Sequence, residues 1–356
     1  MSADILLPAL VRWLDLVAFA ALAGAAGLAL AVVPPDAPEL DGVRRALGRI
    51  CAAATAALLA TSAAELVLRA HTMAGGGLET ALAAMPSVLA RTHFGHLWTL
   101  RATALALLLL LSGSARPGAR WATVLPILAV GAATSLTGHA ADHGDLSLAA
   151  LADCLHVLAS AVWTGGLLCL AGLARSRTGR PSRLPALARR FSRLAGLCLL
   201  AVAVSGVFNA WVELPSVPAL WTTAYGRVLA VKIALVLALA GLGAENRFRI
   251  VPALFVVRGS LPARWFDAAR RRMGAGAVDA ERGFWRLVAR EALLVLAVLG
   301  CTAVLVQLAP PRHQHHPVSS ARYERRIANA AASESAASPP PAAKALAKAP
   351  AWFEPP

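Results

Sequence analysis

Hydrophobic residues along this chain fall into runs of about 20, separated by short polar stretches. A helix of that length crosses the roughly 30 Å hydrocarbon layer of a membrane. Strands of a membrane barrel are about half as long, and lipid cannot satisfy open backbone groups, so the runs predict helices. The pattern predicts an all-α polytopic membrane protein. Its bundle of about eight transmembrane helices covers 9–33, 47–69, 95–113, 121–138, 147–173, 190–213, 225–245 and 288–310.

The composition divides the chain into two parts. Residues 1–310 read as one membrane domain, and 58% of the whole chain is hydrophobic. Residues 311–356 are rich in Ala, Pro, Ser and charge and end in SPPPAAKALAKAPAWFEPP. Such a stretch cannot build a core, so a disordered His/Pro/Ala-rich tail is predicted there.

The net charge of +15 is unevenly distributed. Connections 174–193 and 246–290 are rich in arginine, whereas 139–147 and 214–224 contain no Lys or Arg. This alternation follows the positive-inside rule and predicts cytoplasmic basic loops with both termini outside. Because topology accounts for the charge, membrane lipid is the expected partner and nucleic acid is not. The five cysteines lie in or at the ends of spans without a CxxC pair, which indicates apolar packing for most of them.

Polar residues of the spans are biased toward the predicted outer side. All nine histidines map there, and the cytoplasmic loops have none. Charged and amide side chains within the spans share the bias; they are Asp15, Glu65, Arg101, Asp153, Asn209, Glu213 and Lys232. Ionisable groups in a membrane usually face a wet cavity or pair with one another. We therefore expect an outward-facing cavity, with structural pairing as the alternative, above all for Arg101 and Lys232.

The densest cluster of such residues is TSLTGHAADHGDLSLAALADCLHVLASAVWTGG, from Thr134 to Gly166. His139 and His143 are four residues apart, and Asp153 and His156 three apart, so each pair shares a helix face. Imidazole with carboxylate suits copper, zinc, iron or nickel. The predicted ligands are His139, His143, His156, His96 and His93. Asp153, Asp142, Trp163 and Cys154 are expected around them.

Two outer segments are weaker candidates for metal capture. His71 and Met73 lie in an expected external loop, 70–95, which also contains Met85. The tail opens with PRHQHHP, containing His313, His315 and His316, and a solvated linker is the alternative there.

Several of these stretches together resemble CopD-type copper resistance membrane proteins. DCLHVLASAVWTGGLLCL is similar to the H-x6-W-x-G-G segment of that family. The stretch from Arg190 through Arg247 resembles its core, RTHFGHLWTLRATALALLLLL its third helix, and TGHA the end of its fourth. The resemblance covers roughly residues 90–310.

The resemblance implies a multi-pass protein of the bacterial inner (plasma) membrane that takes copper from the periplasm and moves it inward. A periplasmic carrier of the CopC type is the implied partner, as a separate protein because no such domain is fused here. By position, His139 and His156 would contact the metal, and Trp163, Gly165 and Gly166 would be packing and hinge positions. Methionines number only four, which speaks against a Met-lined copper path.

These observations predict a copper carrier, not an enzyme, since neither a nucleotide-binding loop nor a nucleophile–base arrangement stands out. One alternative is a periplasm-facing copper-binding or assembly factor without transport. The other is an electron carrier with haem b as cofactor, which needs two axial histidines inside the membrane, whereas only His156 is clearly inside a span. The copper oxidation state and the oligomeric state, a homo-oligomer included, are left open.

Overall fold

The computed structural model describes residues 3–75, 77–112, 119–138, 144, 146–175, 183–252 and 277–308. The described residues form helices and connecting turns, without strands. The long helices are α1 Ala3–Gly27, α2 Asp41–Ala74, α4 His93–Ser112, α7 Leu148–Arg175, α8 Leu184–Glu213, α10 Ala224–Glu245 and α13 Ala277–Val306. Shorter elements are η1 Leu28–Val32, η2 Pro38–Leu40, α3 Leu78–Arg91, α5 Ala119–Ala122, α6 Val124–Leu136, α9 Ala219–Thr222 and η4 Asn246–Ile250.

The predicted all-α membrane fold is confirmed. Within the described residues, seven helices are long and apolar enough to cross a membrane. The fourth predicted span, 121–138, corresponds to a shorter apolar helix, Arg120–Leu136, in which Thr123 separates α5 from α6. Contacts divide the chain into Met1–Ala309 and Pro310–Pro356, and the second unit lies outside the described residues.

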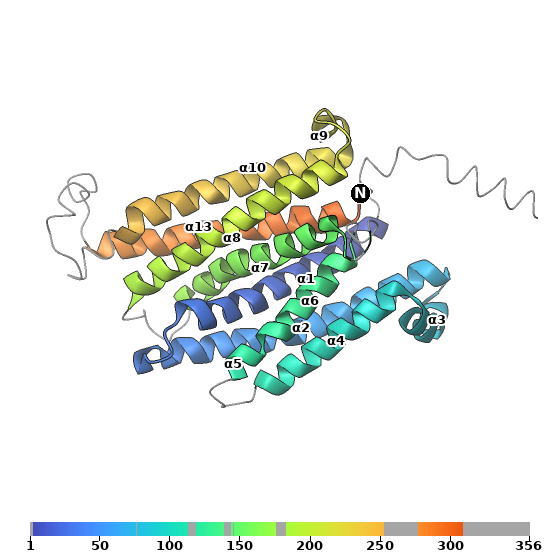
Figure 1. Cartoon of the computed structure of the whole chain (residues 1–356), viewed down its shortest axis with the longest axis horizontal. Helices are drawn as coiled ribbons and strands as arrows, with labels where there is room; N and C mark the ends of the chain where they lie inside the picture. Colours follow the sequence, from blue (N-terminus) through green and yellow to red (C-terminus); the bar gives the residue numbers. More distant parts are fainter. Residues whose placement is uncertain are drawn as a thin grey trace, which may run out of the picture. The chain divides into compact units, whose positions relative to one another are not determined.

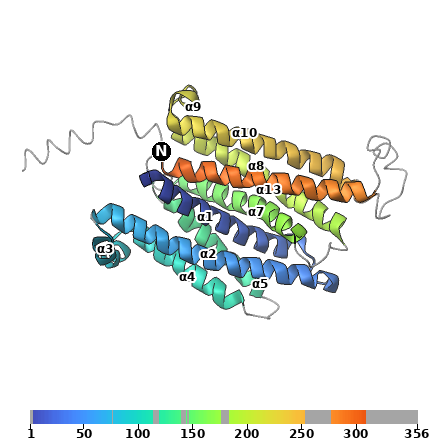
Figure 2. The ribbon, with the colours of Figure 1, turned by 180° about the vertical axis from the view of Figure 1, so that it is seen from behind.

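Helices α1 and α7 form the centre of the first unit. They pack against each other, and α2 and α6 adjoin them on one side, α8 and α13 on the other (Figures 1 and 2). Leu16, Ala20, Trp163 and Leu167 belong to one apolar cluster, while Phe19 and Leu22 of α1 join a second with α4 and α6. The outer faces of α8 and α10 keep large apolar side chains exposed, as lipid contact requires.

The ends of the helices alternate as the arginine pattern predicts. The start of α1 lies at the same end of the bundle as α3 and α9, and η2 and α5 lie at the other end (Figure 1). Arg44 and Arg120 belong to that second end, next to η2 and in α5. The sidedness of the two ends stays a prediction from charge.

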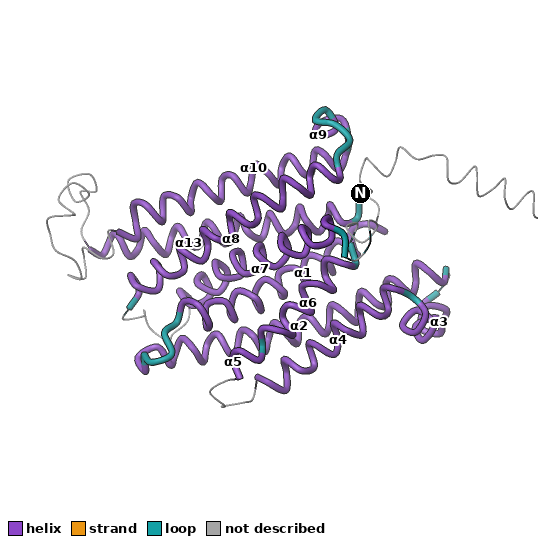
Figure 3. Tube along the Cα trace, in the orientation of Figure 1, coloured by secondary structure: helices purple, strands orange, loops and turns teal. Residues whose placement is uncertain are grey.

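Residues 70–95 are not the loop that we expected. Helix α2 continues to Ala74, and α3 covers Leu78–Arg91, packed against α2 and α4 (Figure 3). Ala81 and Val88 of α3 form a small apolar cluster with Leu66 and Ala70 of α2. The segment is too short and too polar to span a membrane, but Ala81 and Val88 repeat at helical spacing, so tertiary contacts with α2 and α4 stabilise a helix there.

Candidate functional site

The carboxylate of Asp153 joins three helices in the half of the bundle that charge predicts to be outer. Its Oδ2 accepts a hydrogen bond from Ser135 of α6 at 2.6 Å, and its Oδ1 accepts one from Asn209 of α8 at 3.0 Å. Lys232 of α10 also interacts with it electrostatically. The predicted polar residues Asp153, Asn209 and Lys232 are therefore brought together from three separate spans.

His156 lies one helical turn farther along α7, and its ring is positioned by Ser205 of α8. The Nδ1 atom is 3.1 Å from the Ser205 hydroxyl, which itself donates to the Ala201 carbonyl at 2.6 Å. Because that shorter bond uses the serine proton, Ser205 can accept from an Nδ1–H of His156, and in that tautomer Nε2 keeps its lone pair. The ring also hydrogen-bonds to the backbone of Val202. An imidazole in this tautomer offers Nε2 as a metal ligand.

A glycine leaves room for this ring. A Cβ on Gly206 would lie 3.0 Å from Cε1 of His156, closer than side chains normally approach. Neither Ser205 nor the role of Gly206 is evident from spacing along the chain, because both lie on a different helix from His156.

A second polar cluster lies between α1, α2, α4 and α6. Asp15, fully buried, forms an ion pair with Arg101 and accepts a hydrogen bond from Thr61 at 2.7 Å. Arg12 lies 3.3 Å from Glu65 and 3.7 Å from Asp15. Two arginines thus balance two carboxylates, which is the pairing that we weighed as the alternative to an open site for Arg101.

Two adjacent residues of α6 connect the clusters. Thr134 accepts a hydrogen bond from Arg101 on its hydroxyl at 3.3 Å and from Arg12 on its carbonyl at 3.2 Å. Its neighbour Ser135 donates to Asp153. Arg12 was not among the predicted polar residues, although its position three residues before Asp15 in an apolar run was a usable signal.

The remaining predicted ligands are dispersed or undescribed. His71, His93 and His96 are exposed, on α2 and α4, and Met73 is 50% exposed. Cys154 is half-buried on α7, and Glu213 ends α8. Within the described ranges, no three His, Cys, Asp or Glu side chains form a group that could hold a metal ion. The predicted residues that lie outside those ranges are His139, Asp142, His143, His313, His315 and His316.

The motif residues after His156 pack toward the other half of the bundle. Trp163 is 6% exposed and belongs to the apolar cluster that α1, α7, α8 and α13 share. Gly165 lies against the backbone of α1, and Gly166 faces the ring of Phe191. These contacts agree with the packing role that the resemblance implied for the three residues.

Fold and polar clusters together define a polytopic helical membrane protein with charged and imidazole groups inside its bundle. Comparison with known protein families shows which family of membrane proteins this is. Residues 185–305 match Copper resistance protein D, and residues 2–149 match the N-terminal domain of Copper resistance protein D-like proteins. The chain belongs to the CopD-type copper resistance family. The resemblance thus extends to α1 and α2, beyond the range that its motifs indicated.

One relative of this chain is also named for copper. The chain is 30% identical over 212 residues to the copper transport protein CutJ of Bacillus subtilis (strain 168). That alignment covers 55% of this chain and 38% of CutJ, so the chain spans less than two thirds of that relative. No solved structure matches the chain.

Proposed function

We propose that the protein binds copper ion through Nε2 of His156 in the outer half of the bundle and carries it across the bacterial inner membrane. The observation that carries this proposal is the contact between Nδ1 of His156 and Ser205, which in the Nδ1–H tautomer leaves Nε2 as a lone-pair donor. The family and the printed name of CutJ make copper the expected cargo.

The rest of the site comes from the connection between α6 and α7. His139 follows Ser135 by four residues, and His143 precedes Asp153 by ten. Since Ser135 and Asp153 are hydrogen-bonded, the connection starts and ends beside the same carboxylate. We propose that His139 and His143 complete the copper coordination with His156, and that Asp153 lowers the cost of bringing a cation there.

The wider proposal is a carrier and not an enzyme, loaded from the periplasm by a separate CopC-type protein. The exposed His71 and the tail histidines would collect copper at the surface and raise its local concentration. The arginine-rich connections are expected on the cytoplasmic side, so the end of the bundle with His156 would face the periplasm.

The test is copper content and uptake of the full-length protein. Purified protein is compared with His156→Ala and with the His139→Ala, His143→Ala, His156→Ala triple variant, and each is reconstituted in proteoliposomes. His96→Ala is the matched control, because His96 is exposed and lies on α4. We expect near-stoichiometric copper and uptake in wild type and in the control, and loss of both in the other two variants.

Three results would overturn the proposal. Copper that remains bound in the triple variant would place the site elsewhere. Copper binding without uptake in wild-type vesicles would favour a binding or assembly factor. A sharp Soret band in the purified protein would favour the haem electron carrier.

A further inference from the structure

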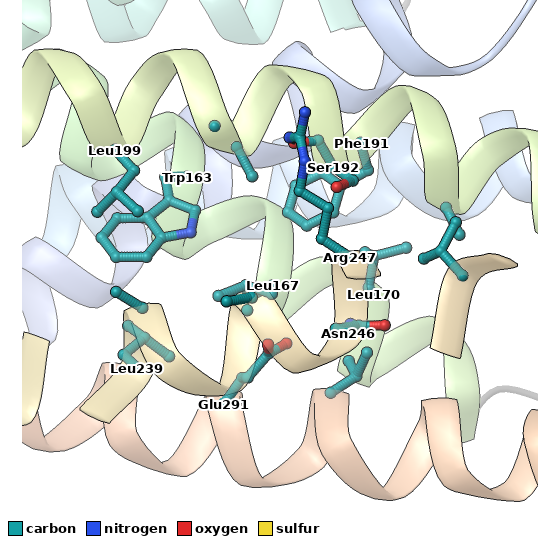
Figure 4. Close-up of a pocket in the computed structure, with 18 of the residues that line it drawn as sticks. Trp163, Leu167, Leu170, Phe191, Ser192, Leu199, Leu239, Asn246, Arg247 and Glu291 are labelled. Atoms are coloured by element: carbon teal, nitrogen blue, oxygen red, sulfur yellow. The ribbon is translucent and has the colours of Figure 1, made fainter. Parts of the chain in front are cut away.

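A cavity of about 190 Å³ lies between α7, α8, α10 and α13, in the half of the bundle that faces the basic connections (Figure 4). Its wall is mostly apolar and includes Trp163, Leu167, Leu199 and Leu239. A cavity of this size has room for about six water molecules at roughly 30 Å³ each. It therefore has space for a small ion together with part of its hydration shell.

One carboxylate points into this apolar cavity. Glu291 of α13 is only 2% exposed, and Figure 4 shows its side chain directed from α13 toward the opposite wall. The side-chain amide of Asn246 hydrogen-bonds to it. Oε2 of Glu291 and Oδ1 of Asn246 have no hydrogen-bond partner among the described residues. Acceptor oxygens without donors in an apolar cavity favour a cation.

Arg247 also lines the cavity, but its guanidinium is hydrogen-bonded to α8 and not to Glu291. Arg247 donates a hydrogen bond to the Ser192 carbonyl of α8 at 2.8 Å. Gly196 accommodates it, since a Cβ there would lie 2.9 Å from the guanidinium. Glu291 differs in this respect from Asp15 and Glu65, each of which has an arginine beside it.

The cavity and His156 share one face of α7. His156 and Trp163 are seven residues apart, which is about two turns or 10 Å along a helix. Asn246 directly follows α10 at the end that adjoins the arginine-rich connection, and Glu291 lies midway along α13. A cation that leaves His156 in the inward direction would therefore meet this cavity next.

We infer that the Glu291 cavity is a second, inner cation site, which binds copper ion through the oxygens of Glu291 and Asn246 before release to the cytoplasmic side. The inference rests on the proposed function. One carboxylate and one amide oxygen bind copper more weakly than a set of imidazoles does. Weak binding at the inner end suits release, because conduction requires that an ion can leave its last site.

The experiment is a copper titration of the full-length protein, followed by uptake into proteoliposomes. The background carries alanine at His71, His93, His96, His313, His315 and His316, so that surface sites do not obscure the count. We expect one tight and one weak copper site. Glu291→Gln removes the weak site alone and slows uptake at least tenfold, Glu291→Asp retains both, and His156→Ala removes the tight site alone.

A second variant guards against a folding artefact. Ala240→Phe places bulk in the cavity while keeping both oxygens, and it too should lose the weak site. The inference is overturned if Glu291→Gln and Ala240→Phe retain two sites and wild-type uptake. The proposed function fails separately, if His156→Ala retains the tight site.

Discussion

Gly24 of α1 and Gly165 of α7 lie backbone to backbone at the centre of the bundle. A Cβ on Gly24 would be 2.1 Å from the carbonyl carbon of Gly165, and a Cβ on Gly165 would be 1.6 Å from the carbonyl oxygen of Ala20. Small residues permit such close approach of membrane helices, where packing replaces the hydrophobic effect as the driving force. Gly165 of the W-x-G-G motif thus lets the helix with His156 pack closely against α1.

We expect Gly165→Ala to destabilise the protein strongly. The added methyl group meets backbone, which cannot move aside as a side chain does, so the cost is at least the ~1–3 kcal/mol typical of overpacking. Thermal unfolding in detergent measures it. Gly172→Ala on the same helix is the control, because nothing lies within 4 Å of a Cβ there. Equal melting temperatures for the two variants would contradict this packing.

The Asp15–Arg101 pair predicts a coupled loss of stability. Asp15→Ala or Arg101→Ala leaves the opposite charge buried and should cost about 3–5 kcal/mol. The double variant should cost less than the sum of the two, because no lone charge remains. Unfolding in detergent gives the coupling energy. Arg249→Ala removes an exposed partner of Glu245 and should change stability by less than about 1 kcal/mol. Additive single effects would mean that the buried pair is not formed.

Ser205→Ala tests the orientation of His156. Without the hydroxyl at 3.1 Å, the ring loses the partner of Nδ1, and copper affinity should fall about 10–100-fold. Competition with a chelator of known affinity provides the measurement. Ser62→Ala is the control, since Ser62 is equally buried but belongs to α2. If both serine variants bind copper as wild type does, Ser205 does not position a ligand.

Met85→Leu should leave copper affinity unchanged. Met85 packs against the apolar cluster of α2 and α3, so its thioether is used in packing. A substitution that conserves volume should also cost less than about 1.5 kcal/mol of stability. Met73→Leu, at an exposed position, is the comparison. Weaker copper binding in Met85→Leu alone would identify a thioether ligand that the packing does not suggest.

The positions of the membrane spans and the alternation of their connections can be predicted from the sequence alone. Hydropathy identifies each span because crossing the hydrocarbon layer requires about 20 apolar residues in succession. The alternation of arginine indicates which connections share a side, and the helix ends in the structure alternate accordingly. Several motifs together, the one around His156 among them, indicated the family, because each lies within one continuous stretch.

Contacts between helices could not be obtained in this way. The partners of His156, Asp153 and Asp15 depend on how each helix is rotated about its axis, and spans made largely of Ala and Leu carry little amphipathic signal for rotation. Sequence reasoning therefore placed Asp153 beside His156 but missed Arg12, Ser205 and Glu291. It also missed α3, whose helix depends on tertiary contacts with α2 and α4.

The sequence by itself determined an all-α membrane protein with most of its intramembrane polar groups toward one end of the spans, because burial in lipid selects composition span by span. Only the tertiary structure decided which of those groups pair with one another and which keep a free ligand atom. Arg101 balances Asp15, whereas His156 is held at Nδ1 by a serine, and Glu291 faces a cavity. Helix packing determines these pairings, because a charged group inside a membrane is stabilised by the partner that a neighbouring helix places beside it.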